Sequence, residues 1–128
     1  KWIQKGIEMY LKRLPDLEIV EIKDSTQMKE EHKIKEIISK NEILVTLDEN
    51  GQSFTSKQLA TKLLNSHHKN ITFVIGGASG LSPSLNNSAS WQLSLSPLTF
   101  PHEIARLLLI EQLYRAKTIT QGGPYHKE

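Results

Sequence analysis

The sequence predicts an α/β domain with a mainly parallel sheet flanked by helices. Near-continuous apolar runs over 42–47 and 71–75 are typical of strands that are covered on both faces. Segments with helical periodicity alternate with these runs, as in parallel α/β folds. The 128 residues contain 38% hydrophobic and 23% charged residues, which are ordinary values for a globular domain. We therefore expect one domain over 1–128, without repeats or linkers.

The expected elements follow in order along the chain. Helical spacing of apolar residues predicts a first helix over 3–14, which Pro15 ends. Thr55 and Gln58 have the spacing of a capping box, and Ser82 and Pro83 offer an N-cap and a first-turn proline. Asn50-Gly51 predicts a turn. The complete expectation is strands at 17–23, 42–47, 71–75 and 91–95, and helices at 3–14, 28–40, 56–66, after Ser82 and at 101–119.

Composition excludes several classes of protein. The chain has no Cys, and its five His show no ligand spacing, so we expect no metal. No apolar run approaches the roughly 20 residues that span a bilayer, and no signal peptide precedes the first helix, so we expect a cytoplasmic protein without a membrane partner. A net charge of +2 does not by itself indicate nucleic-acid binding.

Three loops, at 47–49, 76–80 and 95–100, should meet where the parallel strands end, which is where such sheets bind ligands. Glycines at 76, 77 and 80 would allow close backbone approach to a nucleotide, or simply a tight turn. Asp48 and Glu49 could accept hydrogen bonds from a ribose or belong to a solvated loop. His102 could cap a helix or contact a substrate.

From the residues alone, a nonenzymatic, flavodoxin-like nucleotide-binding or regulatory module remains an alternative to an enzyme. A dehydrogenase is disfavoured, because the glycine order is not G-x-G-x-x-G and because Leu95 and Ser96 stand about where an acidic ribose ligand would be expected. The apolar run at 107–110 covers too much of the last helix for one buried stripe, which favours a second subunit on that helix.

The segments VTLDENGQSFTSKQLA, FVIGGASGLS, LSLSPLTFPHEIARLLLIEQLYRA and PYHKE together resemble SPOUT-class methyltransferases of the RlmH, or YbeA-like, family. This family methylates a pseudouridine of 23S ribosomal RNA at ring nitrogen 3. The resemblance implies S-adenosylmethionine as methyl donor, a homodimer and the ribosome as partner. It also implies a C-terminal trefoil knot, and the family's first N-terminal strand has no counterpart in this chain.

The resemblance also assigns site residues. The donor would bind to three loops, whose residues are Leu47, Gly76, Gly77, Leu95, Ser96, Pro97, Leu98, Thr99 and Phe100. Substrate contacts would come from His102, Arg106, Tyr125, His126 and Lys127. Arg106 could hold a phosphate or stabilise a deprotonated imide, while Tyr125 and His126 are the candidates for proton removal. An unperturbed imidazole, with a pKa of about 6.5, suits that role.

Overall fold

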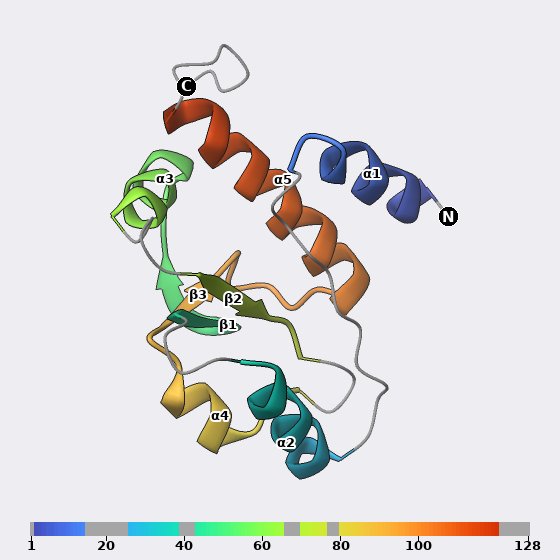
Figure 1. Cartoon of the computed structure of the whole chain (residues 1–128), viewed down its shortest axis with the longest axis vertical. Coiled ribbons are helices and arrows are strands. Elements are labelled where there is room, and N and C mark those ends of the chain that lie inside the picture. The colour runs from blue at the N-terminus through green and yellow to red at the C-terminus, as the bar shows by residue number, and fades with distance from the viewer. Residues whose placement is uncertain (1, 15–25, 39–42, 66–69, 77–79, 121–128) are drawn as a thin grey trace.

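A three-stranded parallel sheet, in the order β2-β1-β3, lies at the centre of the molecule (Figure 1). The computed structural model describes residues 2–14, 26–38, 43–65, 70–76 and 80–120. The strands are β1 (Ile43–Ser53), β2 (Ile71–Val74) and β3 (Trp91–Ser94). The helices are α1 (Trp2–Leu11), α2 (Gln27–Ile37), α3 (Ser56–Leu64), α4 (Pro83–Ser88) and α5 (His102–Thr120).

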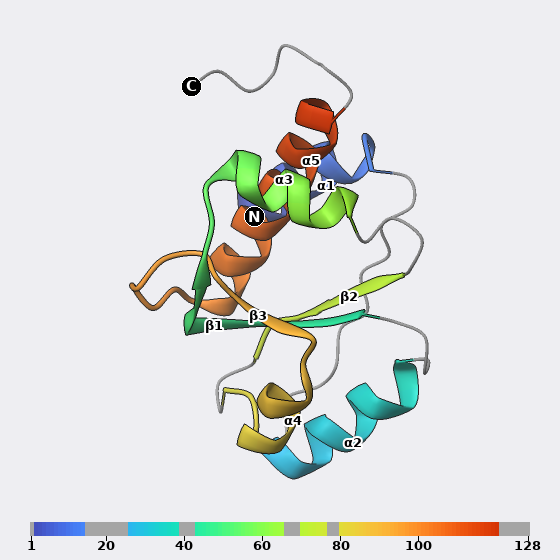
Figure 2. The same ribbon diagram turned by 90° about the vertical axis from the view of Figure 1, so that its left-hand side faces the viewer.

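Helices cover both faces of this sheet, as Figure 2 shows, with α2 and α4 below it and α1, α3 and α5 above it. Successive residues of β1 point to opposite faces. Leu44 packs in the lower layer with α2 and α4, and Val45 packs in the upper layer with Leu59 of α3 and Leu109 of α5. Both side chains are buried, which explains why this strand reads as a continuous apolar run.

The expected helices and strands of the described residues are present, with ends that differ by a few residues. Thr55 and Gln58 form the predicted capping box, in which each side chain accepts from the other residue's backbone N–H. Ser82 caps α4, and Pro83 occupies its first turn. The strand expected at 17–23 lies outside the described residues, and the knot implied by the resemblance stays a prediction.

The turn predicted at Asn50-Gly51 is wrong, because β1 continues through these residues. The strand bends sharply there (Figure 2), and its pairing with β3 shifts so that both Leu47 and Gln52 lie opposite Leu93. A Cβ on Gly51 would lie 2.8 Å from the backbone of Gln92. The glycine therefore permits close strand packing at a bulge rather than a chain reversal.

Other helices of the same chain cover most of the apolar surface of α5, which the sequence had suggested would face a second subunit. Leu109 and Ile110 are buried, and the side chain of Leu107 lies against Gly6 of α1, at 3.2 Å from the position of a Cβ there. Leu108 remains 37% exposed. Most of the apolar excess is thus explained by α1 and α3, and one large side chain is left on the outer surface.

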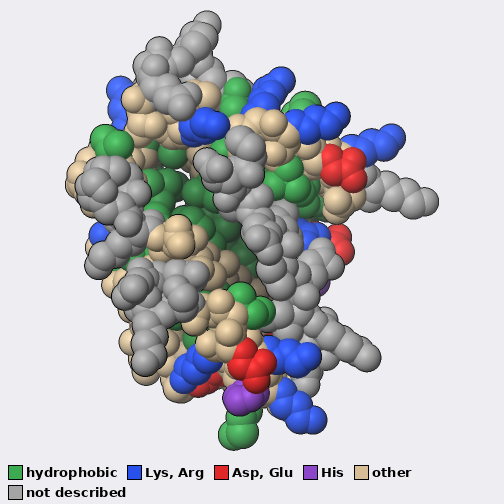
Figure 3. Space-filling model, in the orientation of Figure 1, with side chains coloured by type: hydrophobic (Ala, Val, Ile, Leu, Met, Phe, Trp, Pro, Cys, Tyr) green, Lys and Arg blue, Asp and Glu red, His purple; other side chains and the backbone are tan. Residues whose placement is uncertain are grey.

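Basic side chains on the face seen in Figure 3 gather at its rim, over α1 at the upper right and over α2 below. Hydrophobic side chains line the hollow between these two areas.

Of the helices described above, none combines the length and the apolar character that crossing a bilayer requires.

Candidate functional site

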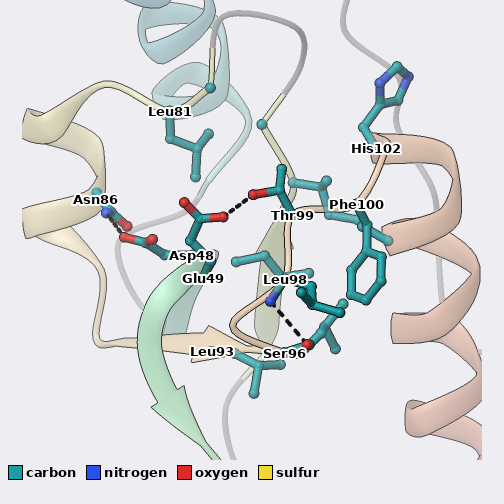
Figure 4. A pocket seen from close by; sticks show the side chains of 16 residues that line it. Asp48, Glu49, Leu81, Asn86, Leu93, Ser96, Leu98, Thr99, Phe100 and His102 are labelled. Carbon is teal, nitrogen blue, oxygen red and sulfur yellow. Dashed lines mark hydrogen bonds between the residues drawn. The ribbon is translucent and has the colours of Figure 1, made fainter.

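A cavity of about 300 Å³ opens where the three strands end. Because the three strands are parallel, and because Thr46 pairs with Val74 and Leu47 with Leu93, the part of β1 that follows Leu47 lies at the same edge of the sheet as the carboxyl ends of β2 and β3. This part of β1 and the segments that follow β2 and β3 surround the cavity, as Figure 4 shows. The loop expected at 47–49 is wrong, because β1 continues through these residues to Ser53. Its lining is Leu47, Asp48, Glu49, Ile75, Gly76, Gly80, Leu81, Asn86, Leu93, Leu95, Ser96, Leu98, Thr99, Phe100, His102 and Ala105.

Gly76 forms the wall of this cavity at the end of β2, where a side chain has no room. A Cβ there would lie 3.0 Å from the backbone C of Gly80 and the backbone N of Leu81. The returning chain therefore packs directly against Gly76. Gly80 has a φ of +71°, in the left-handed region that favours glycine. These two glycines serve different purposes, one for close packing and the other for backbone conformation.

Asp48 is held in place by a chain of hydrogen bonds that begins in the core. Thr46, which is fully buried, donates from Oγ1 to Oδ1 of Asn86 over 2.6 Å. The Nδ2 of Asn86 then donates to Oδ2 of Asp48, also over 2.6 Å (Figure 4). The backbone N–H of Asn50 donates to the other oxygen of Asp48 over 3.0 Å. Both carboxylate oxygens are thus oriented before any ligand arrives.

Glu49 connects β1 to the 95–100 loop at the cavity. Its Oε2 accepts a hydrogen bond from Oγ1 of Thr99 (Figure 4). Its backbone carbonyl accepts one from Oγ of Ser94 over 3.1 Å. Within the 95–100 loop, Ser96 Oγ accepts from the backbone N–H of Leu98. These contacts tie the end of β1 to the 95–100 segment, although Glu49 and Thr99 are themselves exposed.

A second carboxylate network anchors the chain that follows the glycine loop. Glu31 of α2 accepts hydrogen bonds from Oγ of Ser82 and from Oγ of Ser84, the latter over 3.2 Å, and forms an ion pair with Lys35 at 2.8 Å. The hydrogen bond from Lys35, followed by that from Ser82, lowers the pKa of Glu31 from 4.5 to about 2. Glu31 thereby fixes α2 to the first turn of α4.

Glu31 should make stability depend on pH in the acid range. Because its pKa is lower in the folded protein, its ionised form stabilises the fold above about pH 4.5, and this contribution disappears as the pH falls towards 2. We expect Glu31→Gln to lower the melting temperature at pH 6 and to make little difference at pH 2. Thermal melts across this range check it, with Glu36→Gln on the exposed side of α2 as control. An equal deficit at every pH would contradict the assignment.

The structure brings together most of the residues that the resemblance assigned to the donor. The cavity is lined by Leu47, Gly76, Leu95, Ser96, Leu98, Thr99 and Phe100, and also by His102 at the start of α5. Pro97 is exposed and does not line it, and Arg106 is half-buried on α5 beside the lining residue Ala105. Outside the described residues lie Gly77, Tyr125, His126 and Lys127.

Sequence reasoning did not find Asn86, which orients Asp48. The two residues are 38 positions apart, and no local spacing connects an asparagine in a short helix to a strand end. The carboxyl end of a parallel strand was the available signal for Asp48 itself. In the part of the chain that the structure describes, no group of three His, Cys, Asp or Glu side chains is arranged to hold a metal ion.

Comparison with known proteins agrees with this geometry. The family model described as "Predicted SPOUT methyltransferase" matches residues 1–126. The chain is 90% identical to "Ribosomal RNA large subunit methyltransferase H" of Prochlorococcus marinus (strain NATL1A) over 128 residues, which are 100% of this chain and 88% of the relative. Proteins of the same name from Prochlorococcus marinus (strain MIT 9313) and Synechococcus sp. (strain CC9902) are 54% and 52% identical over 126 residues, 98% of this chain and 88% of each relative. The chain belongs to the SPOUT methyltransferase family.

Proposed function

We propose that this protein transfers a methyl group from S-adenosylmethionine to large-subunit ribosomal RNA, at ring nitrogen 3 of a pseudouridine in 23S rRNA. The observation that carries the proposal is the cavity at the carboxyl ends of the three strands, formed by the loops that the resemblance assigns to the donor. The names of the relatives supply the RNA class. Because ribosomes are the substrate in this proposal, we also propose a cytoplasmic enzyme.

The residues present fit such a donor. Leu47, Leu95 and Phe100 offer apolar contacts to an adenine, and the backbone at Gly76 is accessible to a ligand because no side chain covers it. The two carboxylates of the cavity suit a ligand that carries positive charge and hydroxyl groups.

When bound, S-adenosylmethionine supplies a methyl group that its positive sulfur already activates. Transfer forms the bond from ring nitrogen to methyl carbon while the carbon–sulfur bond breaks, its electron pair goes to sulfur, and the imide proton goes to an acceptor. The protein must align the two reacting atoms and help to remove that proton. We assign alignment to the cavity loops, substrate contact to His102 and Arg106, and proton removal to Tyr125 and His126.

Methyl transfer from labelled S-adenosylmethionine to ribosomes that lack the modification tests this function. We expect label in 23S rRNA at the pseudouridine, and none when the ribosomes are already modified. Label at another position of the large-subunit RNA would overturn the assigned nucleotide. Donor binding in calorimetry without any transfer would instead favour a nonenzymatic nucleotide-binding module, and equal binding of NADH would overturn the donor assignment.

We further propose a homodimer that packs through α5, which would also complete the RNA site. Leu108 supports this, as a large apolar side chain that α1 and α3 leave 37% exposed. A symmetric interface places the same patch on both subunits, so one change acts twice.

Leu108→Glu should therefore convert the dimer to a folded monomer, because it buries two charges in the interface. Light scattering at micromolar concentration measures the mass, and circular dichroism checks the fold. The matched control is Leu64→Glu on α3, where the native side chain is 53% exposed, and it should leave the dimer intact. If the unmodified protein is monomeric, the interface proposal fails.

A further inference from the structure

We propose that Asp48 and Glu49 form an acidic wall through which the site prefers the positively charged methyl donor to the product, which has lost that charge. The inference rests on the proposed function and concerns its specificity. S-adenosylmethionine carries a positive sulfur that becomes neutral in S-adenosylhomocysteine when the methyl group leaves. The two ligands otherwise share the same adenosine and the same amino-acid chain.

The first support is the charge of the cavity. Two consecutive carboxylates, Asp48 and Glu49, belong to its lining, and no Lys or Arg side chain does among the described residues. The lining contains one further titratable side chain, His102 on α5. Figure 4 shows His102 on the opposite side of the cavity from Asn86 and Asp48. At neutral pH, aspartate and glutamate ordinarily carry negative charge, so this wall attracts a cation.

The second support is the fixed orientation of these carboxylates. Buried Thr46 accounts for the amide orientation of Asn86, because its hydroxyl donates to Oδ1 and leaves Nδ2 to face Asp48. Asp48 is half-buried, where a charge interaction is screened less than at the surface. Glu49 is held towards the 95–100 loop by Thr99. Groups oriented in advance pay no reorganisation cost when a charge arrives or disappears.

The consequence is an electrostatic difference between donor and product. An interaction made with the sulfur charge is present before methyl transfer and absent after it, whereas contacts with adenine, ribose and the amino-acid end are common to both ligands. The acidic wall should therefore raise donor affinity without raising product affinity equally. This would let the product leave the site more easily than the donor.

Calorimetric dissociation constants for three ligands test the inference: S-adenosylmethionine, S-adenosylhomocysteine and sinefungin, which carries an amine in place of the methylated sulfur. The variants are Asp48→Asn and Glu49→Gln, which remove one charge each and nearly keep the shape. We expect the ratio of product to donor dissociation constants to fall about tenfold in the double variant, with sinefungin weakened like the donor. Glu36→Gln, an exposed carboxylate on α2, is the control and should leave the ratio unchanged.

Two outcomes would overturn the inference, and a third would overturn the proposed function on which it rests. Equal weakening of all three ligands would mean that the carboxylates bind the ribose or the amino group instead of the sulfur charge. Unchanged affinities would mean that they do not contact the ligand. If the unmodified protein binds none of the three ligands, the proposed function itself fails. Thermal melts of each variant distinguish altered recognition from loss of folding.

Discussion

Gly76→Val should abolish binding of S-adenosylmethionine, with a dissociation constant raised by roughly two orders of magnitude or more. A Cβ at this position would already lie 3.0 Å from the backbone of Gly80 and Leu81, and valine adds two methyl groups. Backbone atoms cannot rotate away as a flexible side chain can. The chain from β2 to α4 must therefore move, and this movement changes the wall of the cavity to which we assign the donor.

Calorimetry measures the effect, and the rise in melting temperature on adding donor provides a second readout. A matched control is Gly6→Ala, which adds a Cβ outside the cavity lining, where the nearest atom belongs to the flexible side chain of Leu107. A Gly76→Val protein that binds the donor normally would show that this loop lies outside the donor site.

The elements of the fold could be predicted where their signal is local. Thr55 and Gln58 mark the start of α3 because capping depends on residues three positions apart, and Ser82 marks α4 in the same way. The turn predicted at Asn50-Gly51 was wrong because the same dipeptide occurs both in hairpin turns and in bulges. Which of the two structures forms depends on how closely Gln92 of β3 approaches Gly51. A contact of that kind has no trace in neighbouring residues.

The position of the site could also be predicted, whereas its internal contacts could not. Parallel strands bring their carboxyl ends to one edge, so Leu47, Gly76 and Leu95 were expected to meet, and all three line the cavity. The hydrogen bonds from Thr46 to Asn86 and from Asn86 to Asp48 require exact packing of α4 under β1. The packing of α5 could not be predicted for the same reason. Leu107 contacts Gly6, which lies about a hundred residues earlier in the chain.

Removing residues 125–128 should reduce methyl transfer to ribosomes by about 100-fold or more while leaving donor affinity nearly intact. This prediction rests on the resemblance of PYHKE to the family tail, and it separates a catalytic tail from a dispensable terminus. A short polar segment buries little surface, so its loss should not unfold the domain. Single-turnover transfer, donor calorimetry and melting temperature together measure the three quantities. A truncated protein that methylates ribosomes at the normal rate would refute the role.

His126→Ala identifies what the tail contributes, because its defect should depend on pH. If His126 accepts the imide proton, the variant should be most impaired near neutral pH and less impaired at alkaline pH, where the imide ionises unaided. His102→Ala is the matched comparison, since it removes an imidazole from the cavity lining at the start of α5. A substrate contact at His102 should give a loss that is similar across the pH range. A pH-independent defect in His126→Ala would make that residue a positioning residue, and the same pH-dependent profile in His102→Ala would transfer the proton-accepting role to α5.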